Sequence, residues 1–358
     1  MLAIFRKRPV PVEFRDIQPT HEIDTTPFES SVYNDIQSNG ISISPFKIIH
    51  CATVHYQSRF RKSASLRWLN SFLELITSLS NNNTNGLYLT DIESNEFQTK
   101  SSEVVAVGLS VFLFMKLLNI NSNRISAIES TGKRCDFSAL KNGMEIIFES
   151  KGRKYSNAIN TAIKEVFGKK SHHTSQSKYG VVSHLPRSIS SANIIVVDPD
   201  SDDIEISRKD RIVRLLIHYT KQSYLAGFWR LADLLNIRVG KLLAGSNISE
   251  FENVSLDYQN IYKIGKGYEI RYQDIHMETF FPATREHGFY QKIDNQIYFL
   301  SLDKRLIELL EQQKFSDLLE YQCIFQADDI IDINQRNFFS INTDGSILSS
   351  IAEDDIPT

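Results

Sequence analysis

One stretch in the middle of the chain constrains the fold more than any other: RCDFSALKNGMEIIFESKGR. Residues 134–140 and 144–151 carry apolar and β-forming side chains on the two sides of Asn142-Gly143. An Asn-Gly pair readily adopts the positive φ angles of a two-residue hairpin turn. The stretch therefore predicts two antiparallel strands, with Glu149 and Lys151 on one face because side chains alternate along a strand.

The segments on both sides of this hairpin extend it into a larger α/β unit. Apolar residues at helical spacing precede it, and a second amphipathic helix and two further strands follow it. The expected elements are a helix over 103–118 capped by Ser101 or Ser102, strands over 124–129, 134–140 and 144–151, a helix after Ser156, and strands over 178–184 and 192–197. This order predicts an α/β fold in which a mixed β-sheet is flanked by helices.

A chain of 358 residues is long for one domain, so we expect several parts. We divide it into an N-terminal segment of uncertain fold at 1–95, the α/β core at 96–200, a module with helices and strands at 201–327, and an acidic tail at 328–358. Within the module, residues 208–235 and 303–313 have helical character. The core is thus expected to carry α+β extensions at both ends.

Three residues of the hairpin form a candidate active site. Antiparallel pairing brings the start of the first strand next to the far end of the second, so Asp136 and Glu149 can converge on one cation. Carboxylate oxygens suit Mg²⁺, and a bound cation acidifies water and neutralises charge on a phosphate. Lys151 can orient or deprotonate that water, or stabilise the transition state. Together these groups supply what hydrolysis of a phosphodiester bond requires.

These residues resemble the motif of the PD-(D/E)xK nuclease superfamily, which has the restriction-endonuclease-like fold. The resemblance covers residues 101–199, and Asp136 matches the first acidic residue of the motif. Glu149 and Lys151 match its (D/E)xK element. Cys135 stands where the motif has proline, a position at which members of the family often differ.

The resemblance implies more than the motif itself. It implies a core of helix, three-stranded meander, helix and strand, a Mg²⁺ or Mn²⁺ cofactor held by Asp136 and Glu149, and a further acidic ligand on the first helix, for which Glu103 is the candidate. It also implies an endonuclease that acts on DNA in bacterial antiviral defence, restriction or repair. The alternatives are an RNA-cleaving effector and a non-catalytic nucleic-acid-binding subunit of a defence assembly.

Simpler interpretations of the same residues stand beside these. Glu149 and Lys151 can be a solvated pair at a strand end, where charged residues are common. Glu103 can owe its place to the helix dipole, which favours acidic residues in a first turn.

Charge is distributed unevenly along the chain. The whole chain has a formal net charge of -3, but residues 124–187 hold 12 Lys and Arg against 5 Asp and Glu. A basic region in an acidic protein is typical of a surface that binds a phosphate backbone. The candidate nucleic-acid-binding residues are Arg153, Lys154, Lys169, Lys170 and Lys178. For Lys169 and Lys170, a solvated helix face is the alternative.

Several features indicate a soluble protein of the cytoplasm. The three cysteines are widely spaced and form no zinc-binding pattern, as expected of reduced thiols. The N-terminus lacks the apolar run of a signal peptide. The longest apolar stretch, 104–115, is shorter than the roughly 20 residues that span a bilayer, so we expect a buried helix. We expect no membrane partner, and either a homodimer or a subunit of a larger assembly.

Overall fold

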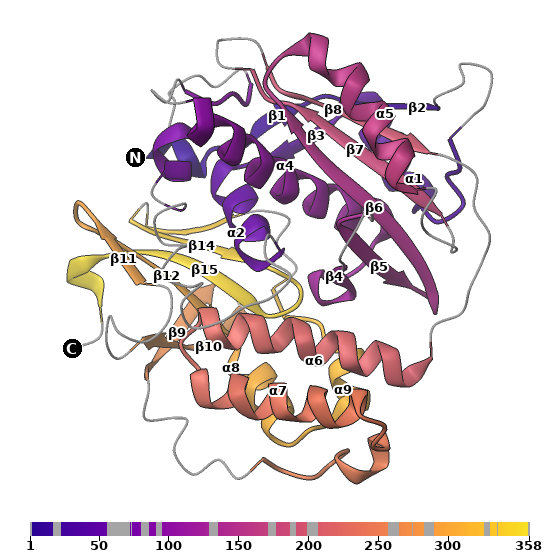
Figure 1. Cartoon of the computed structure of the whole chain (residues 1–358). Coiled ribbons are helices and arrows are strands. Elements are labelled where there is room, and N and C mark those ends of the chain that lie inside the picture. Colours follow the sequence, from indigo (N-terminus) through magenta and orange to yellow (C-terminus); the bar gives the residue numbers. More distant parts are fainter. Residues whose placement is uncertain are drawn as a thin grey trace. The chain divides into compact units, whose positions relative to one another are not determined.

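The computed structural model describes residues 2–16, 23–55, 72, 74–79, 86–90, 95–128, 135–170, 177–186, 191–198, 207–256, 265–273, 275–282, 290–325, 330–334 and 336–356. The described residues form two compact units. Unit 1 comprises those up to Asp198, and unit 2 comprises those from Ser207 onward. Each unit contains its own β-sheet and helices (Figure 1).

Unit 1 is built on a six-stranded mixed sheet with the strand order β2-β8-β7-β6-β5-β4. The strands are β2 (Val12–Asp16), β4 (Ile125–Ala127), β5 (Phe137–Lys141), β6 (Met144–Arg153), β7 (Lys178–His184) and β8 (Asn193–Asp198). Neighbouring strands are antiparallel except for the parallel pairs β6–β7 and β2–β8. A separate antiparallel pair joins β1 (Arg8–Val10) to β3 (Ile41–Ile43). The predicted mixed sheet flanked by helices is therefore confirmed.

The hairpin of β5 and β6 has the predicted two-residue turn. Asn142 and Gly143 have φ angles of 51° and 85°. The strands pair from Lys141↔Met144 to Phe137↔Phe148, and β6 then continues to Arg153 along β7. Beyond Phe148, β6 has left its partner β5, and the candidate active-site residues of β6 lie in this part.

Helices cover both faces of this sheet: α1 (Ser30–Asn39), α2 (Pro45–His55), α4 (Asn95–Leu118) and α5 (Ile159–Lys170) (Figure 1). α4 approaches β6 so closely that a Cβ on Gly152 would lie 2.2 Å from the carbonyl oxygen of Ser102. A Cβ on Gly180 would lie 2.3 Å from a methyl carbon of Val166 in α5. Gly180 pairs with Glu149, so these two residues lie on the same face of the sheet. Glu149 and Gly152 are three residues apart on β6 and therefore lie on opposite faces. The contacts with α4 and with α5 are thus on opposite faces of the sheet.

Aromatic rings fix α4 on the hairpin. Phe114 of α4 stacks on Phe148 of β6 with centroids 4.3 Å apart and an interplanar angle of 8°. Phe148 also stacks on Phe137 of β5, with centroids 5.2 Å apart. All three rings are buried, and removal of such a ring from a core typically costs about 3 to 5 kcal/mol. The stack therefore holds α4, β5 and β6 in one fixed arrangement.

Two predictions about unit 1 need correction. α4 begins at Asn95, before Ser101 and Ser102, and these serines are buried within the helix against β6, where they do not cap it. The segment 1–95, whose fold the sequence left uncertain, was placed outside the core, but it supplies β2 to the edge of the sheet and α2 to the surface of α4. Such long-range pairing leaves no local signal in the sequence.

One helix of the described chain, Lys100–Leu118, is long and apolar enough to cross a membrane. Its most apolar window is 89% buried inside the protein. The helix is a core element, as the sequence predicted, and this is consistent with a soluble protein. Cys51, Cys135 and Cys323 are buried and form no disulfide bond.

Unit 2 contains a five-stranded antiparallel sheet in the order β11-β12-β15-β14-β13 and a hairpin of β9 and β10. The strands are β9 (Gly265–Tyr272), β10 (Ile275–Pro282), β11 (Tyr290–Ile293), β12 (Gln296–Leu302), β13 (Ile330–Ile333), β14 (Asn337–Ile341) and β15 (Ser346–Ala352). The helices are α6 (Arg208–Leu225), α7 (Trp229–Leu243), α8 (Lys304–Glu311) and α9 (Phe315–Leu319).

The acidic tail predicted over 328–358 was wrong. Most of this segment forms β13, β14 and β15, and β15 is the central strand of the sheet. Every residue of β14 and β15 is buried. The predicted helix over 208–235 is two helices, because the chain turns between them at Gly227, where φ is 86°. The predicted helix over 303–313 is confirmed as α8, with Asp303 capping its first turn.

Candidate active site

Asp136 lies just before β5, at the point where β6 separates from that strand. Its Oδ2 accepts a hydrogen bond of 3.1 Å from the backbone N–H of Ser150. The hydroxyl of Ser150 is in turn 2.9 Å from that of Ser110 on α4. Asp136 is half-buried. Its carboxylate therefore pairs with the edge of β6 at a point where β5 no longer does.

Glu149 and Lys151 form an ion pair on β6. The ammonium nitrogen of Lys151 is 2.7 Å from Oε1 of Glu149. The Glu149 side chain is fully buried, whereas that of Lys151 is 20% exposed. The alternative of a solvated surface pair does not fit this burial. The lysine is held by a carboxylate that solvent does not reach.

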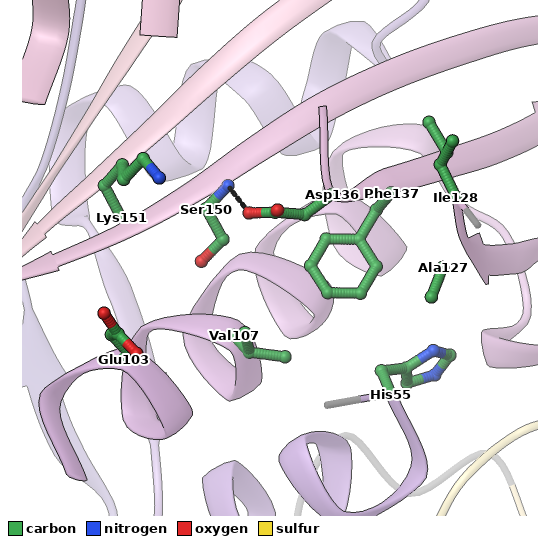
Figure 2. A pocket seen from close by; sticks show the side chains of 9 residues that line it. All are labelled: His55, Glu103, Val107, Ala127, Ile128, Asp136, Phe137, Ser150 and Lys151. Carbon is green, nitrogen blue, oxygen red and sulfur yellow. Dashed lines mark hydrogen bonds between the residues drawn. The ribbon is translucent and has the colours of Figure 1, made fainter. Parts of the chain in front are cut away.

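A cavity of about 320 Å³ brings several of the expected residues together. Asp136 and Lys151 line it, and Glu103 reaches it from α4 (Figure 2). The other lining residues are His55, Val107, Ala127, Ile128, Phe137 and Ser150. Glu149 is not among them, so it adjoins the cavity through its ion pair with Lys151. Glu103 is exposed, and its first-turn explanation fails because α4 begins eight residues before it.

His55 was not among the site residues that the sequence predicted. This residue ends α2, is 3% exposed, and places Nε2 2.7 Å from the hydroxyl of Ser122 in the short helix η2 (Ser122–Arg124). The only signal in the sequence is a histidine within the apolar stretch PFKIIHCATVH, and most such histidines are core residues. Its position beside the cavity depends on the packing of α2 against α4.

The donors of the cavity fit a hard divalent cation. Mg²⁺ commonly binds through one or two carboxylates and keeps several waters, and Mn²⁺ has similar ligand preferences. Glu103, Asp136 and the hydroxyl of Ser150 supply oxygen donors to the same space. Within the described part of the chain, no three His, Cys, Asp or Glu side chains gather into a preformed metal site. The cavity therefore suits a partly hydrated Mg²⁺ or Mn²⁺ better than a cation that requires a full set of protein ligands.

The expected nucleic-acid-binding residues do not all lie in one place. Arg153 and Lys154 follow Lys151 at the end of β6, where Arg153 forms a 2.5 Å ion pair with Glu165. The Lys154 ammonium lies 4.6 Å from the ring centroid of Tyr155. Lys178 pairs with Ile147, six residues from Arg153 along β6, which is roughly 20 Å at 3.3 Å per residue.

Lys169 and Lys170 end α5, but their side chains lie outside the described residues. Of the five candidates, Arg153 and Lys154 are therefore the two that lie nearest in sequence to the cavity residue Lys151.

A second group of buried charges lies within unit 2. Asp344 is fully buried, and its Oδ2 is 2.8 Å from Nε2 of His218 and 2.6 Å from Nε2 of Gln222. Its Oδ1 accepts hydrogen bonds from the backbone N–H and the hydroxyl of Ser346. Burial opposes ionisation, but the hydrogen bonds from His218 and Ser346 outweigh it and hold the pKa of Asp344 well below its ordinary value.

Comparison with known proteins gave no match to a family model, to a curated protein or to a solved structure. Function must therefore be inferred from the chemistry of the site.

Proposed function

We propose that this chain is a metal-dependent nuclease of the PD-(D/E)xK type, which hydrolyses phosphodiester bonds, with DNA as the first substrate to test. The observation that carries the proposal is the cavity that Glu103 of α4, Asp136 beside β5 and Lys151 of β6 all line. Two carboxylates can bind a divalent metal ion, and a lysine can offset charge on a phosphodiester, so this set of groups suits metal-dependent hydrolysis.

The order of elements in unit 1 supports the proposal. α4 is followed by the antiparallel meander β4-β5-β6, then by α5 and by β7, which pairs parallel to β6. The resemblance implies this order of helix, meander, helix and strand. The positions of Asp136 directly before β5, of Glu149 and Lys151 in the second half of β6, and of Glu103 on α4 also support the proposal.

Each residue has a role in the proposed reaction. Lys151 offsets the negative charge that develops on the phosphate in the transition state. Glu149 holds the Lys151 ammonium at 2.7 Å, so the cation is fixed before the substrate binds. Asp136 and Glu103 would hold Mg²⁺ or Mn²⁺, which would supply an acidified water and neutralise phosphate charge. Glu149, which does not line the cavity, acts in this proposal only through Lys151.

The substrate backbone is proposed to run past the end of β6. Arg153 and Lys154 lie two and three residues beyond Lys151, and a phosphate can compete with Glu165 for the Arg153 guanidinium. Lys154 and Tyr155 together offer a cation and an exposed aromatic ring. Such pairs bind the phosphates and bases of nucleic acids without regard to sequence.

Incubation of the pure protein with plasmid DNA, single-stranded DNA and RNA tests the proposal. We expect cleavage in Mg²⁺ or Mn²⁺ and none in EDTA, because the carboxylates alone cannot neutralise the phosphate. Cleavage of RNA alone would favour an RNA-cleaving effector. Binding of nucleic acid without cleavage of any substrate in either metal would contradict the proposed reaction and favour a non-catalytic binding subunit.

A further inference from the structure

The cavity beside Asp136 has two chemically different parts. Glu103 and Ser150 form a polar end, and Asp136 lies between this end and the rest of the cavity (Figure 2). The other part is lined by the side chains of Val107, Ala127, Ile128 and Phe137, with the imidazole of His55 at its margin (Figure 2). A divalent cation and a phosphate would use only the polar end.

The lining of the second part suits one flat organic ring. The whole cavity holds about 320 Å³, which lies at the lower end of the range of about 300 to 1,000 Å³ for small-molecule sites. Such sites combine apolar walls with a few fixed polar groups. Here the polar group is His55, whose ring is held by the hydroxyl of Ser122 at 2.7 Å. A nucleobase has the same combination of apolar faces and a polar edge.

We infer that the apolar part of the cavity binds the base of the nucleotide next to the scissile phosphate. This inference rests on the proposed function and names its substrate class. A phosphate bound through a divalent cation at Glu103 and Asp136 would carry its nucleoside toward Val107, Ala127 and Phe137. A base inside a duplex is stacked on both faces and paired along its edge, so only an unpaired base can enter such a pocket. The preferred substrate is therefore a single strand, or an unpaired nucleotide in a duplex.

The first test uses the wild-type protein alone. A single-stranded oligonucleotide with one preferred cleavage position is compared with the same strand annealed to its complement. A third substrate replaces the base next to that position by an abasic sugar. We expect the duplex and the abasic strand to be cut at least roughly tenfold more slowly than the intact single strand, the order expected for loss of one base-stacking contact.

The second test fills the pocket. Ala127 lies on the edge strand β4, and Ala127→Phe should raise KM for the single strand by roughly tenfold while leaving KM for the abasic strand nearly unchanged. Ala158→Phe, at a half-buried alanine in the short helix η3 (Ser156–Ala158), is the size-matched control and should change neither KM. Equal wild-type rates on all three substrates would overturn the pocket but leave the nuclease intact. No cleavage of any substrate would overturn both.

Discussion

Two groups of buried or half-buried charged residues in this chain differ in their access to a cavity. In unit 2, Asp344 is fully enclosed, and His218, Gln222 and Ser346 occupy its oxygens. In unit 1, Asp136 and Lys151 line a cavity of about 320 Å³ with Glu103. A fully enclosed carboxylate cannot meet a substrate, so its partners serve the fold. A carboxylate that lines a cavity can bind a ligand, and its value to the fold is smaller.

The comparison also shows why burial alone does not identify a catalytic residue. Glu149 and Asp344 are both fully buried, yet Glu149 contacts a lysine that lines the cavity, whereas the side-chain partners of Asp344 within the described residues, His218, Gln222 and Ser346, are themselves buried. The two carboxylates differ in whether a partner of each lines the cavity. It leads to opposite expectations for stability and for activity when the two sites are altered.

The largest effect is expected from Asp344→Ala. Removal of one partner from a buried ionic group leaves His218 without its carboxylate, and the free energy of unfolding should fall by about 3 to 5 kcal/mol. Urea denaturation followed by the fluorescence of Trp229, in a Trp68→Phe background, measures it. Asp317→Ala, at an exposed acid in the first turn of α9, is the control and should cost less than about 1 kcal/mol. A similar small loss for Asp344→Ala would remove the contrast between the two groups.

Lys151→Met should lower the rate of cleavage by about 100- to 1000-fold, the range for loss of one group that stabilises transition-state charge. It should also reduce stability, because Glu149 is left buried without its cation. Addition of Glu149→Gln should restore the stability and leave the activity lost. A double variant that recovers both properties would show that the ion pair is structural only.

Acid should weaken unit 2 through Asp344. Its pKa is lowered in the folded state, so the stability it contributes is complete above the ordinary value of 3.8 and is lost as the pH falls below that value. Urea midpoints of the wild type should therefore decline steeply below pH 3.8. Asp344→Ala should lack this part of the pH dependence, and parallel curves for the two proteins would contradict the assignment.

The smallest effect is expected from Tyr155→Ala. Tyr155 is 59% exposed at the end of β6, and its loss should weaken binding of a single strand by about 1 kcal/mol, or roughly fivefold. Fluorescence anisotropy with a labelled oligonucleotide measures this change. Tyr272→Ala, at a 39% exposed tyrosine of unit 2, should have no effect. Equal behaviour of the two variants would place the nucleic acid elsewhere.

Local sequence signals predicted the hairpin and its turn. Asn142-Gly143 specifies the turn, and the alternation after it sets the strands, so the neighbourhood of Asp136 and Glu149 followed from about twenty residues of sequence. The predicted cap at Ser101 was wrong, because α4 begins earlier, in the polar segment NEFQTK. The buried later turns stabilise the helix and allow it to extend into this segment. Propensity is a weak guide when packing competes with it.

Other features depend on contacts between distant segments. β15 was missed because SILSSIA lacks the alternation of a half-exposed strand, being buried throughout, and because the acids after it suggested a tail. His55 belongs to α2, and only the packing of α2 on α4 brings it to the cavity. A single sequence contains no record of such pairings.

The most direct test of the central claim is the initial rate of DNA cleavage in Mg²⁺ by the wild type, Asp136→Asn and Asp35→Asn. Asp35 is an exposed acid of α1 and serves as the control for loss of a negative charge. Asp136→Asn should reduce the rate at least about 100-fold. Loss of a residue that only supports a metal ligand costs up to about 100-fold, and loss of a ligand itself should cost at least as much. Asp35→Asn should match the wild type, and both variants should keep the wild-type circular dichroism. A folded Asp136→Asn variant that cleaves DNA at the wild-type rate would contradict the account.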